Sequence, residues 1–358
     1  MATVTKSIGT TGRDYSTITA WEADLSNGAV YNSGDSAVGE CYNDSTFDES
    51  FEIDDTGFAA GLTDITLRAH SSAKHDGTPD SGVKVTYTGS ISNEVGVYRI
   101  TYDQGTYGSD KVVIEDIEFA DTSNSASVNV HFIDAGSQKL IIRRCLIHSI
   151  RQASASKNLF IFGSDITAPK AYNCMIFNCG KTATGGSSSG RMQAFYVASS
   201  NSQIYNCTIH NIFDNTAAAE AYGIFDGTVR NCIVTNVDSC YRSGANEQYS
   251  ISSDTTADHS TSLANRDPLT LFVSTIQGSE DLHLKSGASA LRRGNDLGTS
   301  GGVEKDIDGY DRDANNSYWD MGADQCHACQ IQQNQSNQRL SLGFTVGQEV
   351  RRFNLTDF

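Results

Sequence analysis

The chain has 358 residues and a formal net charge of −17, with 43 acidic side chains against 26 lysines and arginines. This excess of negative charge repels phosphate backbones and anionic lipids, so it argues against nucleic acid or an acidic membrane as partner. The hydrophobic fraction of 38% suits a thin core with many turns. No stretch approaches the ~20 apolar residues of a membrane span, and the first residues lack the apolar core of a secretion signal. We therefore expect no membrane insertion and no signal peptide.

The N-terminal part of the chain predicts a short arm at residues 1–13 and then a helix. Ile18, Trp21 and Leu25 recur at the spacing of one helix face. Ser16 or Thr17 would be the N-cap of a helix at about residues 15–26. Because the first coil of a solenoid otherwise exposes apolar side chains and unpaired backbone, we expect this helix to cap it.

Strand-like patterns begin at about residue 37 and become a repeat between residues 112 and 237. Short alternating runs fill residues 37–88 and are separated by turns rich in Asp, Gly and Ser. The later phrase recurs five times, at spacings of 28, 29, 33 and 25 residues. Its central apolar column consists of Ile117, Cys145, Cys174, Cys207 and Cys232. The column one residue earlier is polar and consists of Asp116, Arg144, Asn173, Asn206 and Asn231.

This repeat predicts an all-β parallel β-helix. A period of about 20–50 residues is typical of a solenoid or a propeller. Alternation of apolar and polar positions is the two-residue period of a strand with one buried face. The unequal spacings fit coils whose strands keep register while their loops vary, whereas each propeller blade would need four patterned strands. Rungs should stack about 4.8 Å apart, and we expect the aligned cysteines to be free core thiols rather than disulfides.

Four motifs follow the repeat in a defined order. They are DPLTLFV at 267–273, DLHLKSGASA at 281–290, DIDGYDR at 306–312 and DMGAD at 320–324. Their order resembles the C-terminal closing segment of pectate-lyase-like right-handed parallel β-helix proteins, and residues 14–25 are similar to the start of many such proteins from tailed phages and environmental bacteria. The sequence departs at Ala323-Asp324-Gln325, where Tyr-Glu is usual, and at Ala288-Ser289, where Ser-Pro is usual.

The resemblance covers roughly residues 14–325. It implies a right-handed, single-stranded β-helix over that range, with a closing segment at about 267–325. The motifs that carry the resemblance close the helix and do not catalyse, so the resemblance indicates the fold and leaves the activity open.

Residues 326–358 lie beyond the closing segment and predict a docking or oligomerisation extension with a short β structure. Apolar residues alternate there in two short runs that include Leu342, Phe344, Val346 and Phe353. Nothing in the extension itself covers that apolar face, so the partner could be the same helix, a neighbouring subunit or a larger particle, with intermolecular docking preferred. Cys326 and Cys329 predict a local or intersubunit disulfide or free thiols, because a zinc knuckle would need a second pair.

Outward acidic and basic residues of the repeat are the best candidates for catalysis. Glu115 and Asp116 would lie near Arg143 and Arg144 of the next rung. Glycosidases need two carboxylates about 5–10 Å apart, which stacked rungs can provide, and a polysaccharide lyase would use such an arginine as base. The favoured interpretation is nevertheless a solvated face with ion pairs between rungs, because no second acidic column supports a site.

The sequence gives weaker indications of metal and glycan sites. The DIDG phrase at 306–309 is superficially like a calcium loop, but the family resemblance makes it a structural turn. His148 and His210 share a column two rungs apart, nearly 10 Å and too far for one ion, so we expect no metal and no cofactor. Tyr98, Tyr102 and Tyr107 could stack on sugar rings, although packing between rungs and loops is favoured.

Three functions remain compatible with these patterns. The preferred one is a non-enzymatic surface protein of a tailed-phage virion, a capsid decoration, spike or fibre element that contacts host glycans and is assembled in the host cytoplasm. The alternative is a polysaccharide lyase or glycoside hydrolase on the same fold, and a bacterial adhesin is disfavoured by the missing export signal. Resemblance to phage β-helices implies a homotrimer that binds other virion proteins.

Overall fold

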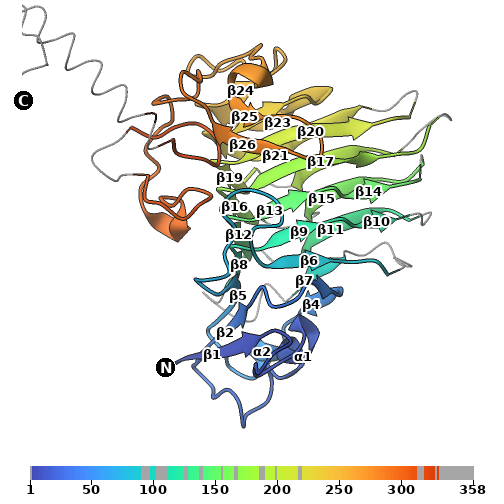
Figure 1. Ribbon diagram of the computed structural model, residues 1–358, viewed down its shortest axis with the longest axis vertical. Coiled ribbons are helices and arrows are strands. Elements are labelled where there is room, and N and C mark those ends of the chain that lie inside the picture. Colours follow the sequence, from blue (N-terminus) through green and yellow to red (C-terminus); the bar gives the residue numbers. More distant parts are fainter. Residues whose placement is uncertain are drawn as a thin grey trace, which may run out of the picture.

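The computed structural model describes residues 2–89, 97–101, 111–124, 128–136, 140–154, 156–164, 168–184, 190–197, 200–216, 220–312, 318–326 and 329. These residues form a nearly all-β structure with two long parallel sheets of 14 and 10 strands and one antiparallel pair. Figure 1 shows the strands stacked along the long axis, from the N-terminal rungs to the C-terminal ones. The all-β prediction is confirmed, and the arrangement is consistent with a parallel β-helix.

The parallel strands form three ladders. The first contains β1 (Thr3–Ile8), β2 (Ser36–Cys41), β5 (Asp64–Ala69), β8 (Lys111–Glu115), β12 (Leu140–Arg143), β16 (Lys170–Tyr172), β19 (Gln203–Tyr205) and the C-terminal parts of β21 (Ala221–Arg230) and β23 (Ser239–Gln248). The second contains β3 (Phe47–Asp48), β6 (Lys84–Thr86), β9 (Glu118–Ala120), β13 (Leu146–His148), β17 (Met175–Lys181), β20 (Thr208–Asp214), β22 (Ile233–Thr235) and β24 (Ile251–Ser252). The third contains β4 (Phe51–Ile53), β7 (Tyr98–Ile100), β11 (Val130–Ala135), β15 (Leu159–Ser164), β18 (Met192–Val197) and the N-terminal parts of β21 and β23. The short strands β10 (Ser123–Asn124) and β14 (Arg151–Gln152) extend the second ladder past a point where the chain bends.

Each coil of the chain passes the first, second and third ladders in turn. Ile147 of β13 pairs with Phe119 on one side and with Ile176 on the other, so equivalent residues of successive repeats lie above one another. All three side chains are buried in one core cluster that runs through the rungs. The loops between ladders absorb the differences in repeat length while the strands keep their register.

Two columns of left-handed residues bend each coil. The first bend joins the first ladder to the second and contains Asp116, Arg144, Asn173, Asn206 and Asn231, with φ between 49° and 62°. The second bend contains Asp121, Ser149, Asn178, Asn211 and Asn236, with φ between 52° and 56°. Asn and Asp tolerate this conformation best among residues with a side chain, because their short polar groups can bond locally. The polar column of the repeat is therefore a column of bends.

The apolar column that follows the first bend lies in the core. Ile117, Cys145, Cys174, Cys207 and Cys232 are each at most 1% exposed. All four cysteines are free, and burial raises their thiol pKa where a shift is resolved, as in Cys145 and Cys174. Such thiols are protonated and inert, and they act as small apolar groups that fill the space inside the bend.

The N-terminal segment begins with a strand and continues into a short helix. Thr3–Ile8, where we expected an arm, form β1 and pair in parallel with β2 over six residues. Six residues with a mixed burial pattern are too few to reveal a strand period in the sequence. The helix α1 (Ile18–Ala23) is shorter than the predicted 15–26, and the side chain of its N-cap Thr17 accepts a hydrogen bond from the backbone N–H of Ala20. Fully buried Trp21 donates its indole N–H to the Tyr31 hydroxyl at 2.8 Å.

The last described segment lies along the side of the rungs. We call residues 267–312 and 318–326 the C-terminal strap. It contains η1 (Pro268–Thr270), η2 (Ser300–Gly302) and the antiparallel pair β25 (Phe272–Ser274) and β26 (Asp281–Leu284), and Figure 1 shows it in orange and red beside the upper rungs. Its apolar residues form a second core with outward residues of the second ladder. From the ladder this core contains Leu146, Met175, Phe177 and Ile233, and from the strap it contains Leu271, Phe272, Leu282 and Leu284.

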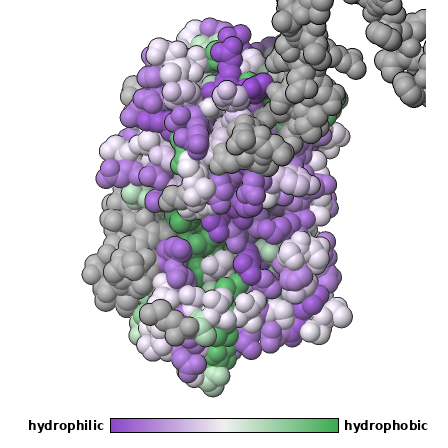
Figure 2. Space-filling model, turned by 90° about the vertical axis from the view of Figure 1, so that its left-hand side faces the viewer, coloured by the Kyte–Doolittle hydropathy of each residue, from purple (hydrophilic) through white to green (hydrophobic). Residues whose placement is uncertain are grey.

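The remaining helix, α2 (Thr56–Ala59), lies between β4 and β5 and buries Phe58. No helix in the described part of the chain is both long and apolar enough to cross a membrane. Figure 2 shows the side of the molecule that carries the first ladder, and its surface is mainly hydrophilic with an apolar band in the lower half. In that ladder the register places Val38, Val113 and Ile141 in one outward column.

Candidate functional site

The first bend binds the C-terminal strap through its asparagine side chains. Asn206 donates to the carbonyl of Val303 at 3.0 Å, and Asn173 donates to the same carbonyl at 3.3 Å. Asn231 donates to the carbonyl of Asn295 at 2.8 Å and accepts the backbone N–H of Asn295 at 2.8 Å. These three asparagines are fully buried, so the bends both turn the coil and satisfy the backbone of a segment 64 to 130 residues away.

Arg312, from the DIDGYDR motif, is the centre of the strap. Its guanidinium is fully buried and donates to the side chain of Asn173 and to the carbonyls of Gly322 and Ala323, at 2.7 to 3.2 Å. It also donates to the carbonyl of Asp320 and to the amide oxygen of Gln325. A planar group with five N–H donors suits this set of acceptors, which explains the arginine at the end of the motif.

Buried carboxylates surround this arginine. Burial raises the pKa of Asp306, Asp320 and Asp324 to about 6 in each case, against the lowering effect of the Arg312 charge on Asp306 and Asp320. Asp324 also accepts the backbone N–H of Leu284 at 2.7 Å. The aspartates of two of the sequence motifs therefore meet in one place, although they lie up to 18 residues apart along the chain.

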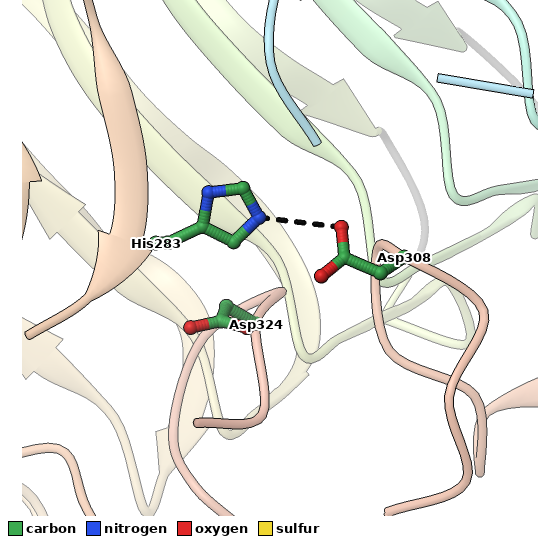
Figure 3. Close-up of side chains that lie close together, drawn as sticks. All are labelled: His283, Asp308 and Asp324. Carbon is green, nitrogen blue, oxygen red and sulfur yellow. Dashed lines mark hydrogen bonds and ion pairs between the residues drawn. The ribbon is translucent and has the colours of Figure 1, made fainter. Parts of the chain in front are cut away.

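His283 joins these motifs into a small cluster, shown in Figure 3 with Asp308 and Asp324. Its Nδ1 lies 2.6 Å from Asp281 Oδ1, and its Nε2 lies 3.2 Å from Asp308 Oδ1. Burial alone would lower its pKa, but the hydrogen bond to Asp308 and the charges of Asp324 and Asp308 raise it to about 10. At neutral pH the ring is therefore an imidazolium held between carboxylates.

The same three residues could offer ligands to a cation, because one atom each of His283, Asp308 and Asp324 lies within 4.8 Å of the others. A metal ion would first have to displace the proton from Nε2, which the carboxylates hold strongly. The backbone of Gly77 also covers the cluster closely, since a Cβ there would lie 2.4 Å from Nε2 and 2.8 Å from Asp308 Oδ1. We therefore assign the cluster as an ion-pair joint within the strap, packed against Gly77 of the loop at residues 74–82.

The predicted catalytic residues form a second ion-pair network. Arg144 binds Asp116 at 2.6 Å and Glu115 at 2.7 Å, and Arg143 binds Glu115 at 2.6 Å. Lys74 binds the other oxygen of Asp116 at 2.7 Å. The predicted ion pairs between rungs are present, but the prediction of a solvated face was wrong for three of these residues, because Glu115, Asp116 and Arg144 are at most 6% exposed.

Local contacts explain why this network is buried. The loop at residues 74–82 covers Arg144, whose carbonyl oxygen lies 2.8 Å from His75 Nε2. The strap covers Arg143, which donates to the carbonyl of Gly301 at 2.6 Å. Hydrogen bonds and ion pairs from Arg144 and Lys74 lower the pKa of Asp116 although burial opposes this. A carboxylate held in this way is a poor general acid or base at neutral pH.

The other predicted site residues fall into two groups. Tyr98 is fully buried against Phe51, Phe119 and Phe132, which confirms the favoured interpretation that it packs in the rungs and excludes the alternative that it stacks on a glycan. Its position in the third ladder points it inward, which its sequence neighbourhood did not reveal. Tyr102, Tyr107 and the docking residues Leu342, Phe344, Val346 and Phe353 lie outside the described residues.

The paired cysteines and the histidine column have local roles. Cys326 and Cys329 form a disulfide at the end of the strap, next to β26. His148 and His210 flank Phe177 in the second ladder, as expected. His148 stacks on Phe177 at 4.9 Å and lies 2.9 Å from Glu118, whereas His210 bonds to Thr235. These two histidines are held by separate partners.

Sequence reasoning missed an aromatic surface on the third ladder. Phe160 of β15 stacks on Tyr196 of β18 at 4.4 Å and 18°, and Tyr196 contacts Phe225 of β21 at 5.4 Å. Arg242 of β23 lies 4.0 Å above the Phe225 ring and 5.5 Å from Tyr222. We call Phe160, Arg191, Tyr196, Tyr222, Phe225 and Arg242 the aromatic face.

No protein-family model, no curated protein and no solved structure matches this chain. The candidate sites therefore rest on the geometry of the described residues. The first is the pair of buried ion networks at the first bend and the strap, which have structural partners throughout. The second is the aromatic face, where side chains of a ligand-binding type are partly exposed.

Proposed function

We propose that this chain is a right-handed, single-stranded parallel β-helix capped by α1, and that it acts as a non-enzymatic surface protein of a tailed-phage virion that contacts glycans. The non-enzymatic part of the proposal rests on the burial and the ion pairs of Glu115, Asp116 and Arg144. These residues are buried and bound to one another under the loop at 74–82. A lyase or glycosidase at this position would need carboxylates or a base that a polysaccharide can reach.

The arrangement of the strap supports a rigid structural role. Fully buried asparagines, Arg312 and a second apolar core fix the strap to the side of the rungs. Such a rod presents long, well-ordered lateral faces, which suit binding on a particle surface better than the loop-built cleft of an enzyme. The similarity of residues 14–25 to the start of β-helix proteins from tailed phages and environmental bacteria supports a virion role, and residues 326–358 are the proposed segment for trimer formation or attachment.

The test for catalysis uses the whole chain and a panel of acidic polysaccharides. We expect no rise in unsaturated-uronate absorbance and no new reducing ends above the buffer control. Sustained turnover that is lost in Glu115→Gln, but kept in Glu40→Gln of the same outward column, would establish the lyase or hydrolase alternative. Glu40 is a suitable control because it lies outside the network and forms an ion pair with Arg68 at 2.6 Å.

Attachment is tested separately by deleting residues 330–358, which leaves the disulfide intact. We expect the shortened chain to fold with an unchanged melting temperature and to lose its association with virions and with other copies of itself. Unchanged association, measured by co-sedimentation and by light scattering, would exclude that role for the extension.

A further inference from the structure

We propose that the aromatic face is the glycan-binding site, and that it recognises an acidic polysaccharide whose sugar rings stack on Tyr196 and Phe225 while its anionic groups pair with Arg191 and Arg242. This inference rests on the glycan contact proposed above. It locates that contact on the outward side of the third ladder.

The aromatic face spans two outward columns of the third ladder, because Phe160 lies in register with Gln193 and Tyr222, whereas Tyr196 lies in register with Gly163. Phe160, Tyr196 and Phe225 come from three successive rungs, and their sequence neighbours Ile161, Phe195 and Ile224 belong to the core cluster. Because strand side chains alternate between the two sides of a sheet, the three rings lie on the outward side. Rungs about 4.8 Å apart bring aromatic rings into contact, and the apolar C–H side of a sugar ring can pack on such a surface.

The exposure of the rings increases along the aromatic face. Phe160 is only 5% exposed, whereas Tyr196, Tyr222 and Phe225 are partly exposed. Phe160 therefore supports Tyr196 from the rung below, at a stacking distance of 4.4 Å. The rings available to a ligand are those of the two upper rungs, where the arginines also lie.

Two arginines give this face positive charge, beside the carboxylate of Glu220, which accepts a hydrogen bond from the Tyr222 hydroxyl. Arg191 is exposed and Arg242 is partly exposed, and their guanidinium carbons lie 5.9 and 4.0 Å from the Phe225 ring centre. Within the described residues neither has a carboxylate at ion-pair distance, in contrast to Arg68, Arg143 and Arg144. On a chain with a net charge of −17, this pair is a local site where an anion gains charge-assisted hydrogen bonds.

Gln193 supplies an independent indication of a ligand. It lies in register between Phe160 and Tyr222, in the same outward column. Its side chain is fully buried, and neither its amide nitrogen nor its amide oxygen has a hydrogen-bond partner. Buried amides without partners are rare because they cost free energy. A sugar hydroxyl, which both donates and accepts, would satisfy this group where binding displaces a neighbouring side chain, because the amide has no exposed surface.

A polar hollow extends the site past Arg242. It has a volume of about 530 Å³ and is lined by Arg242, Asn246, Thr256, Asp258 and His259, among others. The lining also includes the carboxylates of Glu247 and Asp258, and together with the amide, hydroxyl and imidazole groups they suit the hydroxyls of a further sugar unit. The hollow lies at the last rung, so a polysaccharide that follows the aromatic face would pass from the stacked rings into it.

The experiment measures binding of the whole chain to polygalacturonate, alginate, hyaluronate and dextran sulfate by calorimetry and affinity electrophoresis. Dextran controls for the sugar backbone without charge, polyglutamate controls for charge without sugar, and single-stranded DNA tests the other class of polyanion that stacks on aromatic rings. The variants are Arg191→Gln/Arg242→Gln and Tyr196→Leu. Matched controls are Arg266→Gln and Tyr310→Leu, which change exposed residues outside the face.

We expect at least one acidic polysaccharide to bind more tightly than dextran, polyglutamate and DNA. The double arginine variant should weaken that binding at least tenfold and reduce its salt dependence, and Tyr196→Leu should weaken it about fivefold, with the controls within twofold. Melting temperatures establish that each variant is folded. Wild-type binding that the face variants do not change would overturn this inference and leave the glycan contact standing elsewhere.

Other outcomes are also decisive. If the wild type binds none of the four polysaccharides, both this inference and the proposed glycan contact are wrong. Equal binding of polyglutamate would reduce the site to an unspecific patch of charge. Tighter binding of DNA would replace the glycan by a nucleic acid.

Discussion

At the scale of single residues, the first bend shows how one side chain can serve two purposes. Asn173, Asn206 and Asn231 adopt a left-handed conformation that Asn tolerates, and their amides also bind the strap. The asparagines of the second bend have the same backbone conformation but bind within the rungs, as Asn236 binds Asn211 at 2.9 Å and Asn178 accepts from Arg151 at 2.8 Å. A comparison of the two bends therefore distinguishes the need for a left-handed backbone conformation from the need for a contact with the strap.

Replacing Asn206 by glycine tests the docking contact. Glycine keeps the left-handed conformation, so Asn206→Gly should cost about 1–3 kcal/mol through the lost buried hydrogen bonds. Asn236→Gly is the matched control, because Asn236 has the same conformation on an exposed bend, and it should cost about 0.5 kcal/mol or less. Urea unfolding measures both values. Equal costs would show that the bend alone, and not the strap, requires asparagine.

The imidazolium of His283 predicts how stability changes with pH. Its pKa is raised from 6.5 to about 10, so its contribution to stability is fully present below pH 6.5 and is lost as the pH rises through 10. The free energy of unfolding should therefore fall by about 1 kcal/mol per pH unit between pH 7 and 9. His283→Gln should be less stable at pH 6.5 and should lack this slope. A variant with the wild-type slope would contradict the ion-pair assignment.

At the scale of elements, the strap depends on Arg312 and on the second apolar core. The guanidinium of Arg312 reaches acceptors on Asn173, Gly322 and Ala323 at once, which an ammonium group with three donors cannot do in the same plane. The strap should accordingly be the element most sensitive to this one residue. Its loss would expose the outward apolar side chains of the second ladder, such as Met175 and Phe177.

Arg312→Lys should destabilise the protein by about 3 kcal/mol or more, because it leaves buried carbonyls and an amide without donors. The change should also open residues 267–326 to limited proteolysis while the rungs remain resistant. Arg266→Lys is the control, since Arg266 is exposed, and it should leave both measurements unchanged. A strap that resists protease equally in both variants would show that the apolar core holds it without the arginine.

The sequence predicted some of these elements better than others. The core column and the parallel stacking follow from a repeat within 33 residues, so equivalent positions can be aligned by eye, whereas the polar column was not recognised as a column of bends. The strap contacts could not be predicted, because Asn173 and Val303 lie 130 residues apart and no local pattern links them. The aromatic face was missed because the loops before the third ladder vary in length.

At the scale of the whole molecule, the two larger hydrophobic cores of the described residues lie on opposite sides of the second ladder. The inner core runs through the three ladders, and the outer core joins the second ladder to the strap. The charged residues that looked catalytic lie at the junction of the rungs and the strap, where Arg143 contacts both Glu115 and Gly301. The rod leaves its third ladder as the side on which an aromatic and cationic surface is available for binding.

The position of the four column sulfurs tests the stacked-rung account most directly. Anomalous scattering from a crystal of the protein should locate Cys145, Cys174, Cys207 and Cys232 in one line, at steps of about 4.8 Å, in the order of the sequence. All four should be unmodified thiols inside the protein. Sulfur positions that are scattered, out of order or at the molecular surface would contradict the stacked rungs and every assignment that depends on them.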